Sequence, residues 1–369
     1  MEITAAVLRT ADGPYELEQV QLADPGPGEV LVRVVGAGMC HTDVVPRSLD
    51  MLLPIITGHE GAGVVEAIGE GVAGVAVGDH VVLSFDSCGA CASCAKGKPS
   101  YCETFLARNV TGRDVEWGTT VTDASGAGVA ARWFGQSSFA THCIATVRNV
   151  VVVDRDAPLE LIGPLGCGIL TGAGSVLVAL EVQAGDSLVV FGAGAVGLAA
   201  VMAGVVAGAS PIIAVDLHRH RLDLALELGA THVLDGAATG LVEEIQAVTG
   251  GGADFSFDTT GNTAVMTTAI SALRLGGHCG LVGVQTEPLT LDPMALIGKH
   301  ISGILEGSAD PQQLVPQLLE LWRAGRFPFD RLVETFPLAE INEAEAASLA
   351  GRVVKPVLLL PAVEPPATA

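Results

Sequence analysis

The stretch Leu188-Val-Val-Phe-Gly-Ala-Gly-Ala-Val-Gly-Leu198 decides the fold of the second half of the chain. Its apolar start ends on glycines with the spacing GxGxxG, which are Gly192, Gly194 and Gly197. The small residues of a helix follow, and then a β-branched run from Ile212 to Val215. This order predicts a strand, a tight turn, a helix and a parallel strand, which together form the unit that binds a dinucleotide.

Each glycine of this turn has a physical role. Gly192 permits the tight turn, Gly194 lets the backbone approach a pyrophosphate, and Gly197 lets the helix pack close to the strand. The first turn of the helix offers free N–H groups and a partial positive charge to the phosphates. We therefore expect a dinucleotide to bind here.

The choice between NAD and NADP depends on the residues after the second strand. Asp216 lies about 20 residues beyond the glycines, where an acid bonds the ribose hydroxyls and repels a 2′-phosphate. Arg219 and Arg221 follow it, and cations can accept such a phosphate. We give Asp216 more weight because it lies at the strand end itself. We therefore expect NAD, with Arg221 as a further contact.

The region from Leu188 to Val215 has a second interpretation. It contains no charged residue and is long enough to cross a bilayer. The glycines and Ser210-Pro211 interrupt it, however, and a buried parallel-sheet unit equally lacks charge. We therefore favour a buried unit and expect no membrane partner.

Composition narrows the class of protein. The chain has 369 residues, enough for two domains, and its 41 acidic against 19 basic residues give a net charge of −22. Such a surface repels nucleic acid and anionic membranes. The N-terminus has no charged-then-apolar leader, so we expect a cytoplasmic protein. Eight cysteines in that compartment indicate metal binding or catalysis rather than disulfides.

Four of these cysteines lie close together. Cys88, Cys91, Cys94 and Cys102 are separated by two, two and seven residues, which suits one tetrahedral ion. With four protein ligands the site is closed to substrate, so we predict structural zinc. Disulfides are disfavoured by the compartment, whereas an iron–sulfur cluster is an alternative that the spacing leaves open.

The first part of the chain has the pattern of a β-rich domain. Residues 3–20 alternate like a hairpin. Further predicted strands are Val30–Val35, Gly61–Ile68, His80–Phe85 and Thr146–Val153. Residues 107–132 are polar and poorly patterned, which indicates a long loop that is either functional or mobile.

An aromatic cluster follows this loop. Trp133-Phe134-Gly-Gln-Ser-Ser-Phe139 holds three of the chain's few aromatic residues. They form either part of the core or the wall of an apolar pocket. In the pocket interpretation, Phe85, Trp133 and Phe134 contact the substrate.

The later part of the chain alternates strands and helices. The predicted strands are Leu188–Phe191, Ile212–Val215, His232–Leu234, Phe255–Asp258, His278–Val284 and Ile301–Leu305. These predict a six-stranded parallel sheet. An amphipathic helix at 311–324, a strand at Val353–Leu360 and a frayed tail at 361–369 complete the chain.

Several motifs occur together in the order found in one family. Gly58-His59-Glu60-Gly61-Ala-Gly63, Cys40-His-Thr42-Asp43, the four-cysteine segment and the Gly192 loop resemble those of zinc-dependent medium-chain alcohol dehydrogenases over essentially the whole chain. Phe134–Phe139 and Asp258–Asn262 look most like the branch that oxidises benzyl, cinnamyl or geraniol-type alcohols. The resemblance implies an α/β fold, with a β-rich GroES-like catalytic domain and a doubly wound Rossmann domain for the cofactor. We expect the domains at 1–168 and 306–369 (catalytic) and at 169–305 (NAD-binding).

The resemblance also implies a second zinc site, for catalysis. Its ligands would be Cys40, His59 and Cys167, since two thiolates and a neutral imidazole cancel the charge and leave a fourth position open. Glu60 would be a transient ligand. Asp43 would orient the histidine, although a helix-capping role is equally compatible with its position. Cys40, His59 and Cys167 could otherwise be ordinary core residues.

The remaining residues implied by the family bind cofactor or move a proton. Thr42 would take the proton of the alcohol. The residues that would contact the cofactor are Val196, Thr171, His41 and Lys355, although His41 and Lys355 could also be solvated surface charges. Val45 lies where family members that oxidise ethanol often carry a histidine that ends the proton relay. Because valine cannot relay a proton, this favours the aromatic and allylic branch.

We therefore expect an NAD- and zinc-dependent enzyme that converts small apolar alcohols and aldehydes. The family also implies a homodimer or homotetramer. The alternatives are a formaldehyde dehydrogenase that acts on a thiol adduct and a catalytically idle NAD-binding protein on the same scaffold.

Overall fold

The computed structural model describes residues 1–48, 53–113, 120–284 and 287–361. Residues 114–119 of the predicted loop and residues 362–369 of the predicted tail lie outside them. The chain forms two compact units. Unit 1 comprises Met1–Cys167, Asp310–Pro316 and Asp330–Ala369; unit 2 comprises Gly168–Ala309 and Gln317–Phe329. Each unit is described by itself.

Unit 1 contains a small antiparallel sheet. Its order is β4-β1-β2-β7-β8, and its strands are β1 (Glu2–Leu8), β2 (Tyr15–Leu22), β4 (Ile55–Ile56), β7 (Val121–Thr122) and β8 (Gly128–Val129). β1 and β2 form the predicted hairpin, with Ile3 opposite Val20. β7 and β8 lie inside the segment predicted to be an unpatterned loop, and that prediction was wrong there. Strands of two residues are too short to show periodicity, although Val121 and Val129 are buried.

A second sheet carries the candidate site. Its order is β10-β6-β5-β3-β18-β17, with β9 also paired to β3. The strands are β3 (Glu29–Gly38), β5 (Glu60–Ile68), β6 (His80–Leu83), β9 (His142–Thr146), β10 (Val150–Val153), β17 (Val333–Pro337) and β18 (Lys355–Leu359). The single strand predicted at 146–153 was wrong. It is divided between β9 and β10, because a 3₁₀ turn at Val147–Asn149 interrupts the extended backbone.

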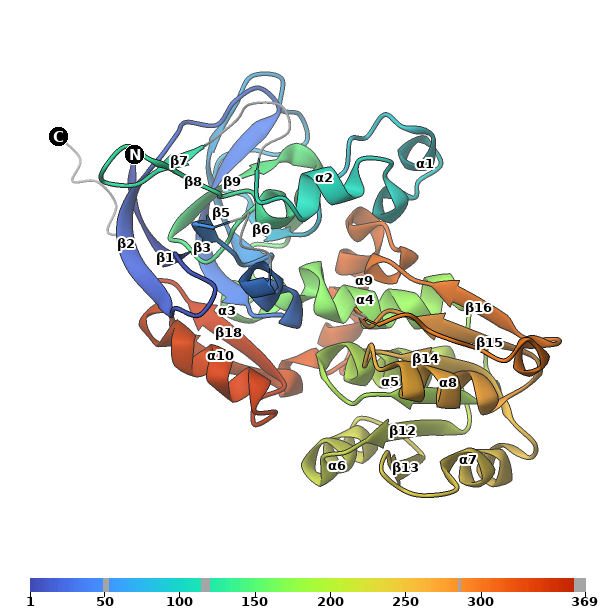
Figure 1. The fold of residues 1–369 in the computed structure, drawn as a ribbon. Coiled ribbons are helices and arrows are strands. Elements are labelled where there is room, and N and C mark those ends of the chain that lie inside the picture. Colours follow the sequence, from blue (N-terminus) through green and yellow to red (C-terminus); the bar gives the residue numbers. More distant parts are fainter. Residues whose placement is uncertain (49–52, 114–119, 285–286, 362–369) are drawn as a thin grey trace. The chain divides into compact units, whose positions relative to one another are not determined.

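Short helices connect these strands. They are the 3₁₀ helix η1 (His41–Ser48), α1 (Ala92–Ala95), α2 (Phe105–Asn109), α3 (Leu159–Ile162) and η6 (Gly163–Gly166). The longer α10 (Ile341–Leu349) lies beside β18 (Figure 1). Helix α9 (Pro311–Arg323), which was predicted at 311–324, is divided between the two units.

Unit 2 is built on a six-stranded, wholly parallel sheet. Its order is β13-β12-β11-β14-β15-β16. The strands are β11 (Leu188–Phe191), β12 (Ile212–Asp216), β13 (His232–Asp235), β14 (Ala253–Asp258), β15 (Leu273–Leu281) and β16 (His300–Gly303). The order reverses between β11 and β14, and ligands of such sheets bind beyond the carboxyl ends of the strands at this point. The predicted fold class is confirmed.

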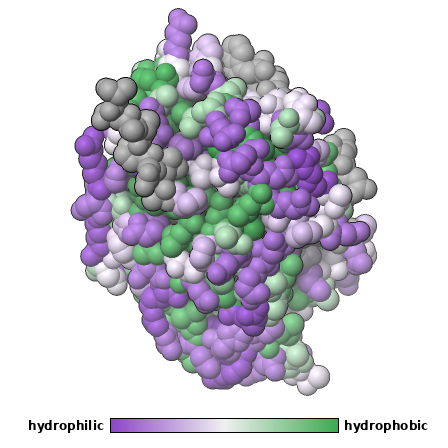
Figure 2. Space-filling view, turned by 90° about the vertical axis from the view of Figure 1, so that its left-hand side faces the viewer, coloured by the Kyte–Doolittle hydropathy of each residue, from purple (hydrophilic) through white to green (hydrophobic). Residues whose placement is uncertain are grey.

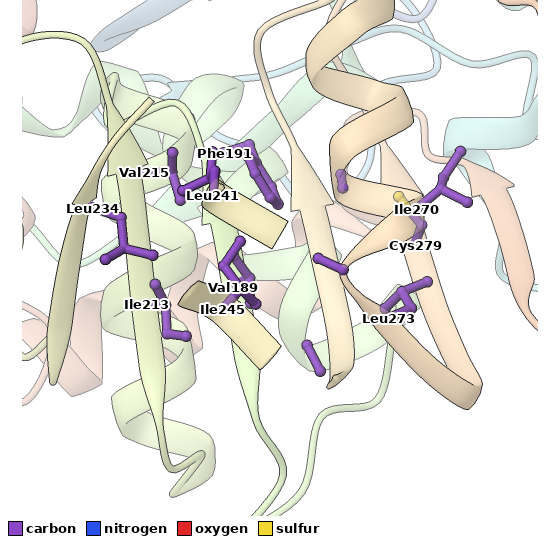
Figure 3. Packing of buried hydrophobic residues seen from close by; sticks show 13 residues of the cluster. Val189, Phe191, Ile213, Val215, Leu234, Leu241, Ile245, Ile270, Leu273 and Cys279 are labelled. Atoms are coloured by element: carbon purple, nitrogen blue, oxygen red, sulfur yellow. The ribbon is translucent and has the colours of Figure 1, made fainter. Parts of the chain in front are cut away.

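Helices cover this sheet. They are α4 (Gly168–Gly174), α5 (Ala195–Ala207), α6 (Arg219–Glu227), α7 (Leu241–Thr249) and α8 (Thr263–Ser271). Figure 3 shows Ile245 of α7 beside Val189 of β11, and Ile270 of α8 beside Cys279 of β15, within one cluster of buried residues. Burying a side chain of this size stabilises a fold by about 1.5–3 kcal/mol. The neighbouring strands β11 and β12 are buried on both faces, which explains why Leu188–Val215 lacks charge.

The surface has a mixed character. Figure 2 shows a face on which hydrophobic residues are exposed among more numerous hydrophilic ones. Among the described residues, no single helix is long and apolar enough to span a membrane. Only one bent pair, at 159–166 and 168–179, meets that requirement, on length and composition alone.

Candidate active site

One cluster of metal-binding side chains lies in unit 1. Cys40 precedes η1, His59 precedes β5, Glu60 begins β5, and Cys167 follows η6. One ligand atom from each residue lies within 4.8 Å of those of the other three. The sheet thus brings together residues that are more than 100 positions apart in the sequence.

His59 is held with one ring nitrogen available. Its Nδ1 lies 2.8 Å from Asp43 Oδ1, whereas its Nε2 is buried and has no hydrogen-bond partner among the described residues. Burial lowers the pKa of His59, but the charges of Asp43 and Cys40 outweigh this and raise it above its ordinary value. An orphaned, buried imidazole nitrogen beside two thiols is what a bound metal ion would satisfy.

Asp43 links three parts of this cluster. Its side chain is fully buried and accepts hydrogen bonds from Gly58 N at 2.9 Å and Cys40 N at 3.0 Å, in addition to facing His59. A carboxylate on Nδ1 fixes the tautomer that presents a lone pair at Nε2. Asp43 thus combines the orienting contact with a local bond to the backbone of its own helix.

Cys40 and Thr42 form the other side of the cluster. A hydrogen bond from Cys167 holds the pKa of Cys40 well below its ordinary value despite burial, and Lys355 acts in the same direction. A lowered pKa favours the thiolate, which is the metal-binding form. The hydroxyl oxygen of Thr42 lies 3.8 Å from Cys40 Sγ. Thr42 therefore offers a proton acceptor beside the metal ligands.

Glu60 forms a buried ion pair with Lys355. The Lys355 ammonium donates to Glu60 Oε1 at 2.8 Å, to Oε2 at 2.9 Å and to Met39 O at 3.1 Å. Burial raises the pKa of Glu60, although Lys355 opposes this effect. All three ammonium donors are used within unit 1. Lys355 thus pairs with Glu60 within unit 1, and its contact with the cofactor stays a prediction.

We expect Lys355→Met to destabilise unit 1 by about 3–5 kcal/mol, because it removes the cation that faces a buried carboxylate. Urea unfolding followed by circular dichroism measures this loss. The double variant Glu60→Met/Lys355→Met should recover at least half of it, since it buries no charge at this position. Equal losses in the single and double variants would show that the charge pair is irrelevant.

The four-cysteine segment forms a second cluster in unit 1. The sulfurs of Cys88, Cys91, Cys94 and Cys102 all lie within 4.8 Å of one another, and none is paired in a disulfide. Backbone N–H groups point at them; Cys91 N, for example, lies 3.2 Å from Cys88 Sγ. Hydrogen bonds from the backbone of Cys94 and Glu103 lower the pKa of Cys91 to about 6. Four converging thiols suit a tetrahedral zinc ion.

Unit 2 contains a cavity of about 440 Å³ at the carboxyl ends of β11, β12 and β14. It is lined by Gly192, Gly194, Asp216, Arg221 and Thr259, among others. Asp216 Oδ2 accepts from Ala193 N at 2.7 Å and Oδ1 from His218 N at 2.8 Å, so the carboxylate is fixed at the strand end. The buried Nε of Arg221 has no partner among the described residues.

The glycines of the turn are each constrained differently. Gly192 has a φ of 93°, which side chains disfavour. A Cβ on Gly197 would lie 1.7 Å from Gly192 O, whereas one on Gly194 would meet nothing within 4 Å. Gly194 therefore leaves space on the side of the cavity, as the approach of a pyrophosphate requires.

Three other predicted cofactor contacts are placed as follows. Val196 lies in the first turn of α5 and packs closely against Gly172 of α4. A Cβ atom added to Gly172 would lie 2.1 Å from the carbonyl oxygen of Val196. Thr171 of α4 is buried and donates to Glu306 Oε2 at 3.2 Å. His41 is exposed at the start of η1, in unit 1.

The predicted pocket aromatics are buried. Trp133 is fully buried, and Phe85 and Phe134 are exposed by 3% and 5%. Phe134 stacks on His59 with ring centroids 4.5 Å apart, and Phe85 packs against Phe105 at 5.6 Å. Trp133 thus belongs to the core, while Phe134 lies directly against the metal-binding cluster.

Comparison with known proteins identifies the family. Residues 26–155 match the model of the alcohol dehydrogenase GroES-like domain, and residues 195–322 match that of the zinc-binding dehydrogenase. The chain belongs to the zinc-dependent alcohol dehydrogenase family. It is therefore an alcohol dehydrogenase, and its two clusters fit two zinc ions per chain, with NAD as the cofactor typical of the family.

Relatives with named activities cover nearly the whole chain of this alcohol dehydrogenase. A geraniol dehydrogenase from Castellaniella defragrans is 46% identical, over 96% of this chain and 97% of the relative. The crystal structure of a benzyl alcohol dehydrogenase from Acinetobacter calcoaceticus has a TM-score of 0.94 and 42% identity, covering 98% and 100% of the two chains. An alcohol dehydrogenase zinc-binding domain protein from Burkholderia ambifaria has a TM-score of 0.96 and 48% identity, with the same coverage.

Sequence reasoning missed several residues around the alcohol dehydrogenase site. The Lys355–Glu60 pair, the Thr171–Glu306 bond and the stack of Phe134 on His59 join residues that are 75 or more positions apart. No local pattern marks such partners. Of these contacts, only the one made by Phe134 had a sequence signal, which was the three aromatic residues of the segment Trp133–Phe139.

Proposed function

We propose that the enzyme oxidises primary alcohols attached to an aromatic ring or a double bond, and reduces the matching aldehydes, with NAD as hydride carrier. The observation that carries this proposal is the cluster of Cys40, His59 and Cys167, which has an orphaned Nε2 and an aromatic ring against it. The geraniol and benzyl alcohol dehydrogenases among the relatives favour the same substrate class.

Each residue would contribute a defined step. Cys40, His59 and Cys167 would hold the catalytic zinc, which as a Lewis acid lowers the pKa of an alcohol hydroxyl. Thr42, beside Cys40, accepts a hydrogen bond from that hydroxyl and, as it takes the alcohol's proton, passes its own proton on toward solvent. Gly192, Gly194 and the start of α5 bind the pyrophosphate, and Asp216 bonds the adenosine ribose.

Val45 favours aromatic and allylic alcohols as substrates, because it lies where the family resemblance implies the histidine that often ends the proton relay in members that oxidise ethanol. It lies in the same helix η1 as Thr42. An aliphatic side chain exchanges no proton. We infer that the proton reaches solvent through water and the ribose hydroxyls of the cofactor.

The assay that tests the proposal compares two alcohols. We expect purified enzyme with NAD to oxidise benzyl alcohol at least about tenfold faster, by kcat/KM, than ethanol, as measured by NADH absorbance. One tenfold step corresponds to about 1.4 kcal/mol of preferential transition-state binding, which a single apolar contact can supply. Turnover should disappear on chelation and return with zinc. Formaldehyde turnover that requires a small thiol, without benzyl alcohol turnover, would favour the thiol-adduct alternative.

Asp216→Ala tests the assignment of the cofactor. We expect it to raise kcat/KM for NADP relative to NAD by about 10- to 100-fold, because a like charge facing the 2′-phosphate is removed. Asp235→Ala is the matched control. Asp235 ends the neighbouring strand β13 opposite Asp216 but does not line the cavity. An unchanged cofactor ratio in Asp216→Ala would refute the role of Asp216.

A further inference from the structure

Phe134 has an unusual backbone conformation. Its φ of 50° and ψ of 36° lie in the left-handed region, inside the short helix Trp133–Gly135. A bulky residue with a positive φ is a genuine outlier that costs free energy. Strain of this kind persists where the surrounding structure imposes it, and it gathers at functional sites.

The conformation places the ring of Phe134 on the imidazole of His59. The two rings are nearly parallel, with centroids 4.5 Å apart and an angle of 27° between their planes. Two further rings contact Phe134 edge-on, and neither of them stacks on His59. Trp133 lies 5.6 Å away at 67°, and Phe105 lies 6.3 Å away at 85°.

The same segment also fixes the backbone of His59. Gln136 is fully buried, and its Nε2 donates to His59 O and to Ser84 O, at 3.0 Å each. Its Oε1 accepts from Gly61 N at 3.0 Å. Gln136 thus bonds to the backbone on both sides of Glu60, the residue at which β5 begins. A segment that only filled the core would not need these directed polar contacts.

His59 is therefore restrained from several directions. Asp43 holds Nδ1, Gln136 holds the backbone, and Phe134 covers one face of the ring. Nε2 remains as the ring nitrogen without a partner among the described residues. Rotation of the imidazole about its side-chain bonds would break the stack with Phe134. The stack thus restricts the direction in which Nε2 points.

We propose that Phe134 is a positioning residue for His59, and that its strained backbone is retained to aim Nε2 at the catalytic metal. The proposal rests on the proposed function, because it assumes metal at the cluster of Cys40, His59 and Cys167. An imidazole that donates its lone pair to a cation becomes electron-poor, and such a ring is attracted to the π face of an aromatic side chain. The stack therefore favours the metal-bound form of His59.

The experiment replaces the catalytic metal with Co²⁺, whose visible absorption bands report ligand geometry. We compare wild type with Phe134→Leu, which keeps apolar volume but removes the ring, and with Phe134→Tyr, which retains it. Phe105→Leu is the matched control, because Phe105 belongs to the same aromatic cluster but packs tilted against Phe85 and edge-on against Phe134, without stacking on His59. The rate of metal release to a chelator is the second readout.

We expect Phe134→Leu to shift the Co²⁺ bands and to release metal at least about tenfold faster, the range seen when partners behind metal ligands are removed. Phe134→Tyr should restore both readouts, and Phe105→Leu should leave them unchanged. Should Phe134→Leu fold poorly, Phe134→Gly removes the ring while accepting the positive φ, and the same changes are expected.

Three results would overturn the proposal. A Phe134→Leu enzyme with wild-type bands and wild-type metal release would overturn the positioning role and leave the proposed function intact. Equal changes in Phe134→Leu and Phe105→Leu would show that general packing, not the stack, is responsible. A wild-type protein that binds no metal at this cluster would overturn the proposed function and the positioning role together.

Discussion

Replacing Thr42 with Ala should lower kcat by about 10²- to 10⁴-fold and leave the metal content unchanged. The size follows from the usual contribution of one proton-transferring side chain. Thr42 lies beside Cys40 without belonging to the cluster of metal ligands, so its loss removes a proton acceptor and no ligand. Stopped-flow measurement of NADH formation, with zinc measured by atomic absorption, tests both parts.

Thr42→Ser is the control for this experiment, because serine keeps a hydroxyl at the same position. We expect it to retain most of the activity. If Thr42→Ala turned over benzyl alcohol at a near wild-type rate, another group would have to accept the proton.

Cys167→Ala should abolish measurable turnover and reduce the zinc content from two ions per chain to one. Losing the Lewis acid removes several kcal/mol of transition-state stabilisation, which is about 10³-fold or more in rate. The four-cysteine cluster should keep its ion, because none of its sulfurs comes from this residue. Metal analysis and the benzyl alcohol assay on the same sample measure both effects.

Cys143→Ala is the matched control for Cys167→Ala. Cys143 is a buried thiol in β9, and burial raises its pKa to about 12, so it stays protonated and inert. We expect this variant to keep both zinc ions and full turnover. Two zinc ions and normal rates in Cys167→Ala would remove Cys167 from the ligand set.

The cofactor unit was the more predictable half of the fold. Its central strands β11 and β12 carry the clearest signal, because a strand buried on both faces is an uninterrupted apolar run, such as Leu188–Phe191 and Ile212–Val215. Boundaries were less accurate where a run lacked sharp ends. The strand predicted at His278–Val284 extends in the structure from Leu273 to Leu281, since glycines at 276 and 277 hide its beginning.

The catalytic unit was less predictable, because its partners are remote in sequence. Cys88–Cys102 could be recognised from spacing alone. Cys167 could be proposed only from the family resemblance, since nothing near it repeats the pattern of Cys40 or His59. The ion pair of Lys355 with Glu60 spans 295 residues and is created by strand pairing, which single-residue patterns do not encode.

The position of β18 has a consequence for how the enzyme is made. This strand, at Lys355–Leu359, is inserted between β3 and β17, and it supplies the cation that faces Glu60. A ribosome releases it after every other strand of the described residues, whereas the six strands of unit 2 are complete once residue 303 has emerged. Domains commonly fold from the N-terminus as synthesis proceeds. Here the pairings of β18 with β3 and β17 close the catalytic sheet only after the six strands of unit 2 have emerged. A nascent chain stalled before Lys355 would thus carry a complete Rossmann sheet and a Glu60 that still lacks its cation.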